Sequence, residues 1–198
     1  MNRTSKIIKI MVRSAIFGAI SALPFTRFSL PIFPEFLKIH IDEIPAFIAG
    51  FAYGPLVSLF VLIIKTLIGL PFTTSLCVGE AIDLIYSICF VLPTILIYKK
   101  INKKYGLIIG IVIGVVLQLL TSFFLNIFVM FPFYCYIYDL SMSELQEICY
   151  SVNNNVKDLR YSLGFYIVLP FNSIKDAIVL IVTLLVALPL NPVFKKIK

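Results

Sequence analysis

Long runs of apolar residues dominate the chain. A helix needs about 17–25 such residues to cross the hydrocarbon core of a bilayer. Runs of this kind, one of them shorter, lie at residues 7–24, 43–53, 55–71, 79–98, 106–134 and 164–190. The pattern predicts an all-α integral membrane protein, with residues 1–198 forming a single membrane-embedded domain.

The second run is too short to span a bilayer alone. Tyr53-Gly54-Pro55 separates it from the third run and predicts a helix break, so 43–53 is expected to form a short tilted helix. The fifth and sixth runs are longer than a span requires, which predicts tilt or an extension beyond the membrane. A polar loop near 135–163 lies between them, where Ser141 and Glu144 match a capping box and predict a short helix.

Basic residues orient the predicted helices. Eleven of the 17 Lys and Arg residues lie in three segments that contain no Asp or Glu: Arg3, Lys6, Lys9 and Arg13; Lys99, Lys100, Lys103 and Lys104; Lys195, Lys196 and Lys198. Six spans with both termini in the cytoplasm place all three segments inside, as the positive-inside rule requires. Omitting the short run would place two of them outside. We therefore expect a multi-pass protein with six transmembrane helices.

Composition supports this interpretation and excludes others. The chain is 60% hydrophobic and 14% charged, and its net charge of +7 is concentrated beside apolar runs. This distribution indicates a lipid bilayer as partner rather than nucleic acid. The sequence contains no phosphate-binding G-x-x-x-x-G-K-[ST] loop and only one histidine, which argues against an ATPase or a Ser-His-Asp hydrolase. The four cysteines lack C-x-x-C spacing. For Cys135 and Cys149 we expect free buried thiols, with a disulfide between them as the alternative.

Several polar residues interrupt the apolar runs. Lys65, Lys175 and Asp176 each carry a charge that costs about 2.5–3.5 kcal/mol at the centre of a membrane helix, so each needs a partner or a polar cavity. Asn126 and Asn172 carry amides that donate and accept, and therefore suit the edge of a planar heterocycle. Structural ion pairs and interhelical hydrogen bonds are the alternative explanations.

Two further motifs each have two interpretations. His40, Asp42 and Glu43 precede Pro45 and could bind a divalent metal, but we favour a helix start, with Asp42 as cap and Glu43 complementing the helix dipole. No metal site is therefore predicted. Ala15 and Ala19 form a small-residue stripe beside Gly18 and Ala22. Such spacing allows close helix packing, either within the chain or against a partner.

Four segments together resemble a known family. "FPEFLKIHIDEIPAFIAGFAYGPLVSLFVLIIKTLIG", "VGEAIDLI", "NIFVMFPFY" and "LPFNSIKDAIV" are similar, in this order, to the S component of energy-coupling factor (ECF) vitamin transporters, and closest to the riboflavin-specific S component. The resemblance covers about residues 8–188 without the loop near 135–163. It implies the six-helix S-component fold in a bacterial cell membrane, with a vitamin pocket near the outer face under the loop between the first two helices.

The resemblance also assigns roles to residues. It implies that Asn126, Asn172 and Lys175 hold the isoalloxazine ring, and that Phe36, Leu37 and Lys38 in the covering loop contact the ribityl side. It further implies that the alanine-x-x-x-alanine motif of Ala15 and Ala19 docks on a membrane coupling (T) subunit.

The function implied is capture of riboflavin from outside the cell for ATP-driven uptake. Two cytoplasmic ATPase subunits would supply the energy, so the chain itself is not expected to be an enzyme, and riboflavin is a transported ligand rather than a cofactor. The alternatives are an S component for FMN or another vitamin, and a membrane-embedded enzyme using Glu80, Asp83 or His40. "HIDEIP" replaces the family's usual "DFSDIP", and Asp83 replaces a frequent asparagine, so the charge of the pocket is expected to differ.

Overall fold

The computed structural model describes residues 3–23, 27–29, 38–73, 76–101, 104–157 and 161–197. Its elements are nearly all helical, and η denotes short 3₁₀ or π segments. In chain order they are α1 (Arg3–Ser21), β1 (Arg27–Ser29), β2 (Lys38–His40), α2 (Ile44–Tyr53), α3 (Pro55–Gly69), η2 (Leu70–Phe72), α4 (Val78–Ile101), α5 (Lys104–Leu125), η3 (Asn126–Met130), α6 (Phe131–Tyr138), α7 (Met142–Val152), α8 (Tyr161–Leu163), η4 (Gly164–Val168) and α9 (Leu169–Ile197).

Four helical stretches in the described chain are long and apolar enough to cross a membrane. They are Pro55–Phe72, Val78–Ile101, Tyr105–Tyr138 and Tyr161–Ala187. The last two are longer than a span needs, as their sequence predicted, since π segments η3 and η4 continue into neighbouring helices. α1 has 19 residues but carries four basic side chains, and α2 has only 10 residues.

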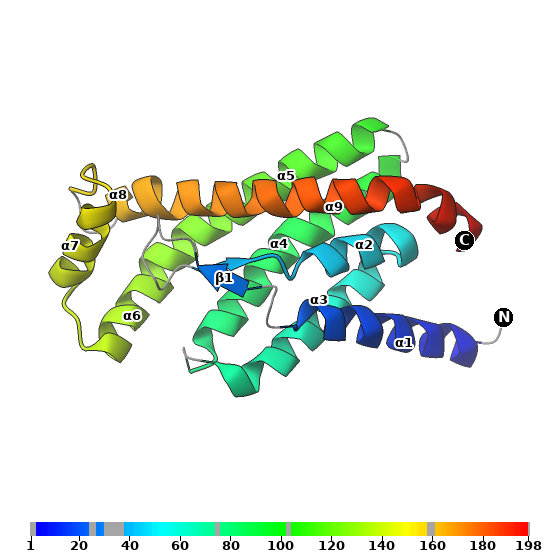
Figure 1. The fold of residues 1–198 in the computed structure, drawn as a ribbon, viewed down its shortest axis with the longest axis horizontal. Helices are drawn as coiled ribbons and strands as arrows, with labels where there is room; N and C mark the ends of the chain where they lie inside the picture. Colours follow the sequence, from blue (N-terminus) through cyan, green and yellow to red (C-terminus); the bar gives the residue numbers. More distant parts are fainter. Residues whose placement is uncertain are drawn as a thin grey trace.

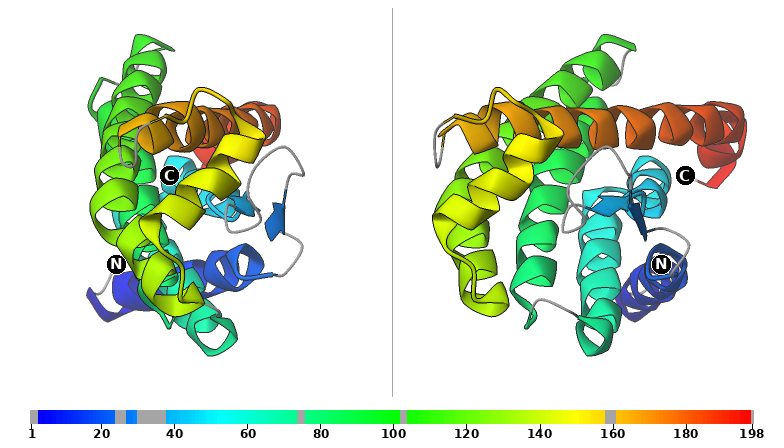
Figure 2. Two further views of the ribbon diagram at one scale, coloured as in Figure 1. Left: turned by 90° about the vertical axis from the view of Figure 1, so that its left-hand side faces the viewer. Right: turned by 60° about the vertical axis from the view of Figure 1, so that its left-hand side comes forward.

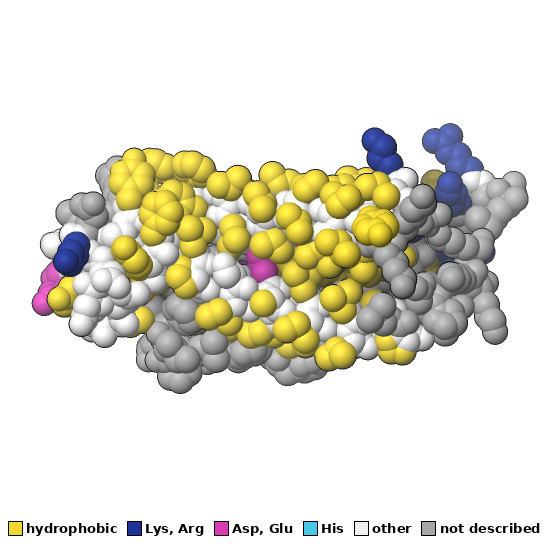
Figure 3. Space-filling view, turned by 90° about the horizontal axis from the view of Figure 1, so that it is seen from above, with side chains coloured by type: hydrophobic (Ala, Val, Ile, Leu, Met, Phe, Trp, Pro, Cys, Tyr) yellow, Lys and Arg dark blue, Asp and Glu magenta, His cyan; other side chains and the backbone are white. Residues whose placement is uncertain are grey.

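The ends of the molecule differ in character. Both chain termini lie at one end, and α7 lies at the other, with α9 running most of the distance between them (Figure 1). In the two turned views α2 lies between α9 above it and α1 below it (Figure 2), and α2 contacts both helices. Seen from above, apolar side chains cover most of the middle, where a small acidic patch also shows. Lys and Arg gather toward one end, and Asp and Glu lie at the other end beside a basic side chain (Figure 3).

Local sequence signals explain where the helices begin and end. Gly54 has a φ of 113°, which favours glycine, and Pro55 begins α3, so the predicted break between α2 and α3 is confirmed. The capping box is also confirmed: the Ser141 hydroxyl accepts from the Glu144 backbone N–H, and the Glu144 carboxylate accepts from the Ser141 backbone N–H. The backbone N–H and the hydroxyl of Ser141 both donate to the Glu144 carboxylate, and these two hydrogen bonds hold the Glu144 pKa below its ordinary value.

Two short strands from the segment between α1 and α2 pair as a hairpin. β1 pairs antiparallel with β2, with Phe28 opposite Ile39. Ile39 is fully buried and belongs to an apolar cluster that includes Phe131, Leu145 and Val168. Packing of Ile39 among residues of α6, α7 and η4 thus holds β2 against these three elements.

All four cysteines are free, which confirms that part of the prediction, but Cys135 is only partly buried. Cys135 and Cys149 both belong to the α6–α7 region, and Cys149 is completely buried in the same cluster as Ile39. Burial raises the pKa of the Cys149 thiol to about 11. This thiol is therefore unreactive while the fold is intact.

Candidate functional site

The first half of the site is a buried ion pair network around Lys65. Lys65 on α3 donates from Nζ to Asp42 Oδ1 at 2.8 Å, Asp83 Oδ2 at 3.1 Å and Ser87 Oγ at 3.1 Å. The Lys65 side chain is 2% exposed, and Asp42 is fully buried. The Lys65 ammonium thus joins the loop before α2 to α3 and α4. These contacts are the partners that a charged residue inside an apolar run was predicted to need.

The Asp42 carboxylate lies just before α2 and outside the long helices. Its burial alone would raise its pKa, but the Lys65 ammonium and His40 overcome that effect and hold the pKa well below its ordinary value. The group therefore stays ionised across the physiological range. The prediction that Asp42 caps α2 is wrong: the N-cap residue is Glu43, no side chain caps this helix, and Asp42 binds Lys65 instead.

The second half is formed around Lys175 on α9. Its Nζ donates to Glu43 Oε1 at 2.8 Å, and the same oxygen accepts from Ser87 Oγ at 3.2 Å. Glu43 is fully buried and Lys175 is 3% exposed. Ser87 therefore connects the Lys175 pair to the Lys65 network, so a continuous set of polar contacts joins the loop before α2 to α3, α4 and α9.

Two buried amides lie on α9 and at the start of η3. Asn172 Nδ2 donates to the backbone oxygen of Val168 at 3.0 Å, and its Oδ1 accepts from Gln118 Nε2 at 3.0 Å. Asn126 Nδ2 donates to Tyr86 Oη and to the Ser122 backbone oxygen, each at 2.8 Å. Both amides therefore make interhelical hydrogen bonds, which the sequence offered as the alternative to ligand binding. A π segment begins at Asn126, and such segments are frequent at functional sites.

Asp176 follows Lys175 and is 1% exposed. Among the described residues, neither of its carboxylate oxygens has a hydrogen-bond partner. Asn172, Lys175, Asp176 and Val179 are all buried and recur at three- and four-residue intervals, so they share one inward face of α9. The structure thus groups two of the three predicted ring-binding residues on one helix face.

The predicted loop contacts with the ligand are Phe36, Leu37 and Lys38. Phe36 and Leu37 lie outside the described residues, and of Lys38 only the backbone in β2 is described. In the sequence they precede Asp42 of the polar network by four to six residues. These three residues therefore stay predictions.

The small-residue stripe of α1 divides into two faces. Ser14, Gly18 and Ser21 are buried against the bundle, whereas Ala15 and Ala19 are exposed. A Cβ added to Gly18 would lie 2.5 Å from Ile64 Cγ2, so glycine is required for the close approach of α1 to α3. Packing within the chain hence accounts for Gly18 and leaves the two alanines on the outer surface.

An apolar groove lies beside these alanines. It has a volume of about 450 Å³ and is formed by α1 and α3. Its lining residues are Met11, Val12, Ser14, Ala15, Phe60 and Ile64. Ala15 thus lines a concave surface, and another helix can pack closely into a surface of this shape.

Sequence reasoning missed four members of the site: Gln118, Tyr86, Ser87 and the pairing role of Glu43. Gln118 could have been predicted, because burying its amide within an apolar run costs free energy just as burying the amides of Asn126 and Asn172 does. Tyr86 and Ser87 had none, since both residue types are common in membrane helices.

Comparison with known proteins supplies the family. The sequence profile described as "ECF transporter, substrate-specific component" matches residues 9–187. The chain is 28% identical over 197 residues to the riboflavin transporter RibU of Staphylococcus aureus (strain TCH60), covering 100% of this chain and 96% of that protein. It is 28% identical over 193 residues to the riboflavin transporter FmnP of Bacillus subtilis (strain 168), covering 94% of each.

A solved structure agrees with the sequence relatives. It is described as the S component of a bacterial ECF transporter, and it superposes with a TM-score of 0.70 at 25% identity, covering 98% of this chain and 99% of that one. The match extends over nearly all of both chains, so the helices and the hairpin belong to one shared fold. The family's role is transport rather than catalysis, and a membrane location agrees with the four apolar stretches. The chain belongs to the family of substrate-specific components of ECF transporters.

Proposed function

We propose that this chain captures riboflavin at the outer face of a bacterial cell membrane and delivers it to an ECF module. The observation that carries the proposal is the near full-length similarity to two riboflavin transporters. In this proposal Asn126, Asn172 and Lys175 contact the flavin ring, and Phe36 to Lys38 cover its ribityl side. Buried amides and an ammonium inside an apolar bundle suit a ligand with a polar ring edge and apolar faces.

The charge of the site favours riboflavin over FMN. Asp42, Glu43, Asp83 and Asp176 contribute four carboxyl groups, whereas Lys65 and Lys175 contribute two ammonium groups that already bind carboxylates. Among the side chains that the structure describes here, acidic groups outnumber basic ones, and a phosphate would add further negative charge. We therefore propose uncharged riboflavin as the ligand.

Purification in detergent after expression with riboflavin tests the ligand. The protein is expected to be yellow, with quenched flavin fluorescence that returns on denaturation, and excess FMN is expected to displace little of the bound flavin. Colourless protein that also fails to quench added riboflavin would exclude riboflavin while leaving the family intact. A bound compound recovered in chemically altered form would instead favour the membrane-enzyme alternative.

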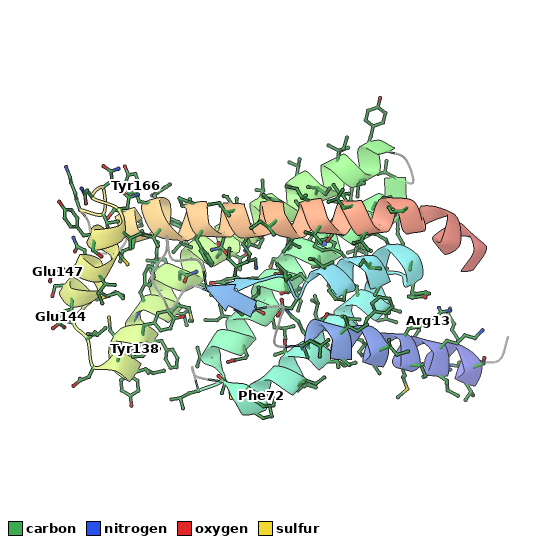
Figure 4. All side chains as sticks on the ribbon, in the orientation of Figure 1. Arg13, Phe72, Tyr138, Glu144, Glu147 and Tyr166 are labelled. Atoms are coloured by element: carbon green, nitrogen blue, oxygen red, sulfur yellow. The ribbon has the colours of Figure 1, made fainter. Side chains whose placement is uncertain are left out.

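We further propose six membrane spans with both termini in the cytoplasm and the whole chain as one domain. Arg13 on α1 lies at the opposite end of the molecule from Glu144 and Glu147 on α7 (Figure 4). The Arg13 guanidinium lies 4.0 Å from the ring centroid of Tyr53, which ends the short α2. This arrangement supports a basic inner end and an acidic outer end, as the positive-inside rule expects.

Thiol labelling tests this orientation. Cys77 is exposed between η2 and α4, on the side predicted to face outward. A membrane-impermeant maleimide is expected to label Cys77 in intact cells at least about tenfold more than Tyr105→Cys in a Cys77→Ser background, because Tyr105 is exposed in the first turn of α5, at the end proposed to face the cytoplasm. Permeabilising the cells is expected to remove the difference. Equal labelling of both positions in intact cells would contradict the topology.

We propose that Ala15 and Ala19 dock on the membrane coupling subunit of a module that also holds two cytoplasmic ATPases. Ala15→Trp fills the groove beside α1, so it is expected to weaken assembly with the module at least about tenfold while leaving flavin binding unchanged. Ile20→Trp is the control, because Ile20 is 43% exposed on the other side of α1. Co-purification with the coupling subunit measures the effect. Normal assembly of Ala15→Trp would show that docking occurs elsewhere.

A further inference from the structure

The amide of Asn126 has a fixed orientation. Its Nδ2 lies 2.8 Å from the backbone oxygen of Ser122 and 2.8 Å from Tyr86 Oη. A backbone carbonyl can only accept a hydrogen bond, so the amide atom beside Ser122 is the nitrogen, and both of its N–H groups are engaged. Among the described residues, Asn126 Oδ1 accepts no hydrogen bond. Asn126 is buried, so its amide offers one unused acceptor inside the bundle.

The amide of Asn172 is fixed with the opposite polarity. Its Nδ2 lies 3.0 Å from the backbone oxygen of Val168, which again can only accept. Its Oδ1 accepts from Gln118 Nε2 at 3.0 Å. Within the described part of the chain, one N–H of Asn172 therefore stays unused. This amide offers a donor, whereas Asn126 offers an acceptor.

Gln118 on α5 is fully buried, and its Oε1 has no hydrogen-bond partner among the described residues. An amide oxygen buried without a donor costs free energy, and a methionine of similar size would fill the same space without that cost. Filling space is therefore not a sufficient role for Gln118. Its Nε2 supplies one, because donation to Asn172 occupies Oδ1 of that amide and leaves the second N–H for another partner.

The unused groups of the site match one edge of the flavin ring. Among the described residues Lys175 Nζ donates to Glu43 alone, and an ammonium has three N–H groups, so donors remain there too. The site thus offers one acceptor, on Asn126, and donors on Asn172 and Lys175. The imide edge of the isoalloxazine ring carries the complementary set, one N–H between two carbonyl oxygens.

We propose that Gln118 is a positioning residue that holds Asn172 as a donor toward a carbonyl oxygen of the flavin imide, whereas Asn126 accepts from the imide N–H. Tyr86 and the Ser122 carbonyl have the corresponding positioning role for Asn126. The site thereby selects a ligand by its imide edge as well as by the shape of its ring. A buried site of this kind rejects analogues that lack the matching group, because its own polar atoms are then left unpaired. The inference rests on riboflavin binding as the proposed function.

Flavin analogues test the assignment by competition against riboflavin, followed by quenching of riboflavin fluorescence with purified protein. The analogues are riboflavin methylated on the imide nitrogen and the two derivatives with sulfur in place of one imide carbonyl oxygen. Methylation is expected to weaken wild-type binding at least about tenfold, since it removes the donor that Asn126 reads. One of the two sulfur derivatives is expected to bind about 3- to 10-fold more weakly than riboflavin, since sulfur is a weaker acceptor for Asn172.

Gln118→Met is the test variant, because methionine keeps the size of the side chain and removes the donor. It is expected to bind riboflavin about 5- to 20-fold more weakly and to lose the discrimination against that sulfur derivative, but to keep the discrimination against the methylated imide. Leu117→Met, on the exposed side of α5, is the control and is expected to match the wild type. Unchanged riboflavin affinity in Gln118→Met would overturn the proposal. Equal weakening for riboflavin and all three analogues would also overturn it, since that result marks a bond that only joins α5 to α9.

Thermal unfolding in detergent gives a second readout without ligand. Gln118→Met and Asn172→Leu remove the same hydrogen bond, so the double variant is expected to lose less Tm than the two single losses added together. If riboflavin does not bind the wild type but this coupling is present, the ligand assignment fails and the orientation of Asn172 by Gln118 stands. If the two losses simply add, the positioning role of Gln118 fails.

Discussion

Lys175→Met is expected to abolish riboflavin binding and to lower the free energy of unfolding by about 3–5 kcal/mol. The loss of stability follows from Glu43, which is fully buried and would retain a charge without the ammonium now 2.8 Å away. The loss of binding follows from the proposed contact of Lys175 with the flavin ring. Quenching of flavin fluorescence measures binding, and thermal unfolding in detergent measures stability.

A double variant separates these two effects. Lys175→Met with Glu43→Gln removes both charges and keeps an oxygen at position 43 that can accept from Ser87 Oγ. It is expected to recover most of the lost stability without recovering riboflavin binding. Wild-type affinity in the double variant would mean that Lys175 only neutralises Glu43 and does not contact the ligand.

The helices could be predicted from the sequence because their signals are local. Run length and the glycine at position 54 fixed the break between α2 and α3, and Ser141 with Glu144 fixed the start of α7. These features depend on residues within one or two turns of each other. Local signals do not determine the number of membrane spans. α1 has basic residues among its apolar ones and α2 has only 10 residues, so neither resembles the four long apolar stretches.

The polar network could be predicted only in part. The cost of burying Lys65 and Lys175 showed that each needed a partner, but the partners lie far away in sequence: Asp42 is 23 residues from Lys65, and Glu43 is 132 residues from Lys175. The same distance explains the wrong role given to Asp42. Sequence near α2 shows a good helix cap, whereas a buried carboxylate gains more from an ammonium at 2.8 Å than from one backbone N–H.

The stripe on α1 shows a similar limit. Ala15, Gly18 and Ala19 have equivalent helix-packing potential by spacing alone. Only the packing of α1 against α3 shows that Gly18 faces Ile64 and that the two alanines face outward. Spacing therefore predicted a close contact correctly and could not assign it to the chain or to a partner.

Lys65→Met is expected to be among the most destabilising single substitutions in the chain, at about 3–5 kcal/mol. It would leave Asp42 and Asp83 without the ammonium they share and would break the link between the loop before α2, α3 and α4. Lys100→Met is the matched control: Lys100 is exposed at the end of α4, so it is expected to change stability by less than about 0.5 kcal/mol.

A thiol-reactive dye in a Cys77→Ser background measures these changes, because buried Cys149 reacts only after unfolding.

The triple variant Lys65→Met, Asp42→Asn and Asp83→Asn removes the charges together and is expected to be more stable than Lys65→Met alone, since buried amides cost less than carboxylates that have lost their ammonium. Lowering the pH is a second way to remove the charge of Asp42 while its side chain stays in place. Asp42 has a depressed folded pKa, so its contribution to wild-type stability is present above about pH 4 and is lost as the pH falls further. A triple variant no more stable than Lys65→Met would attribute the loss to the shape of the lysine side chain rather than to its charge.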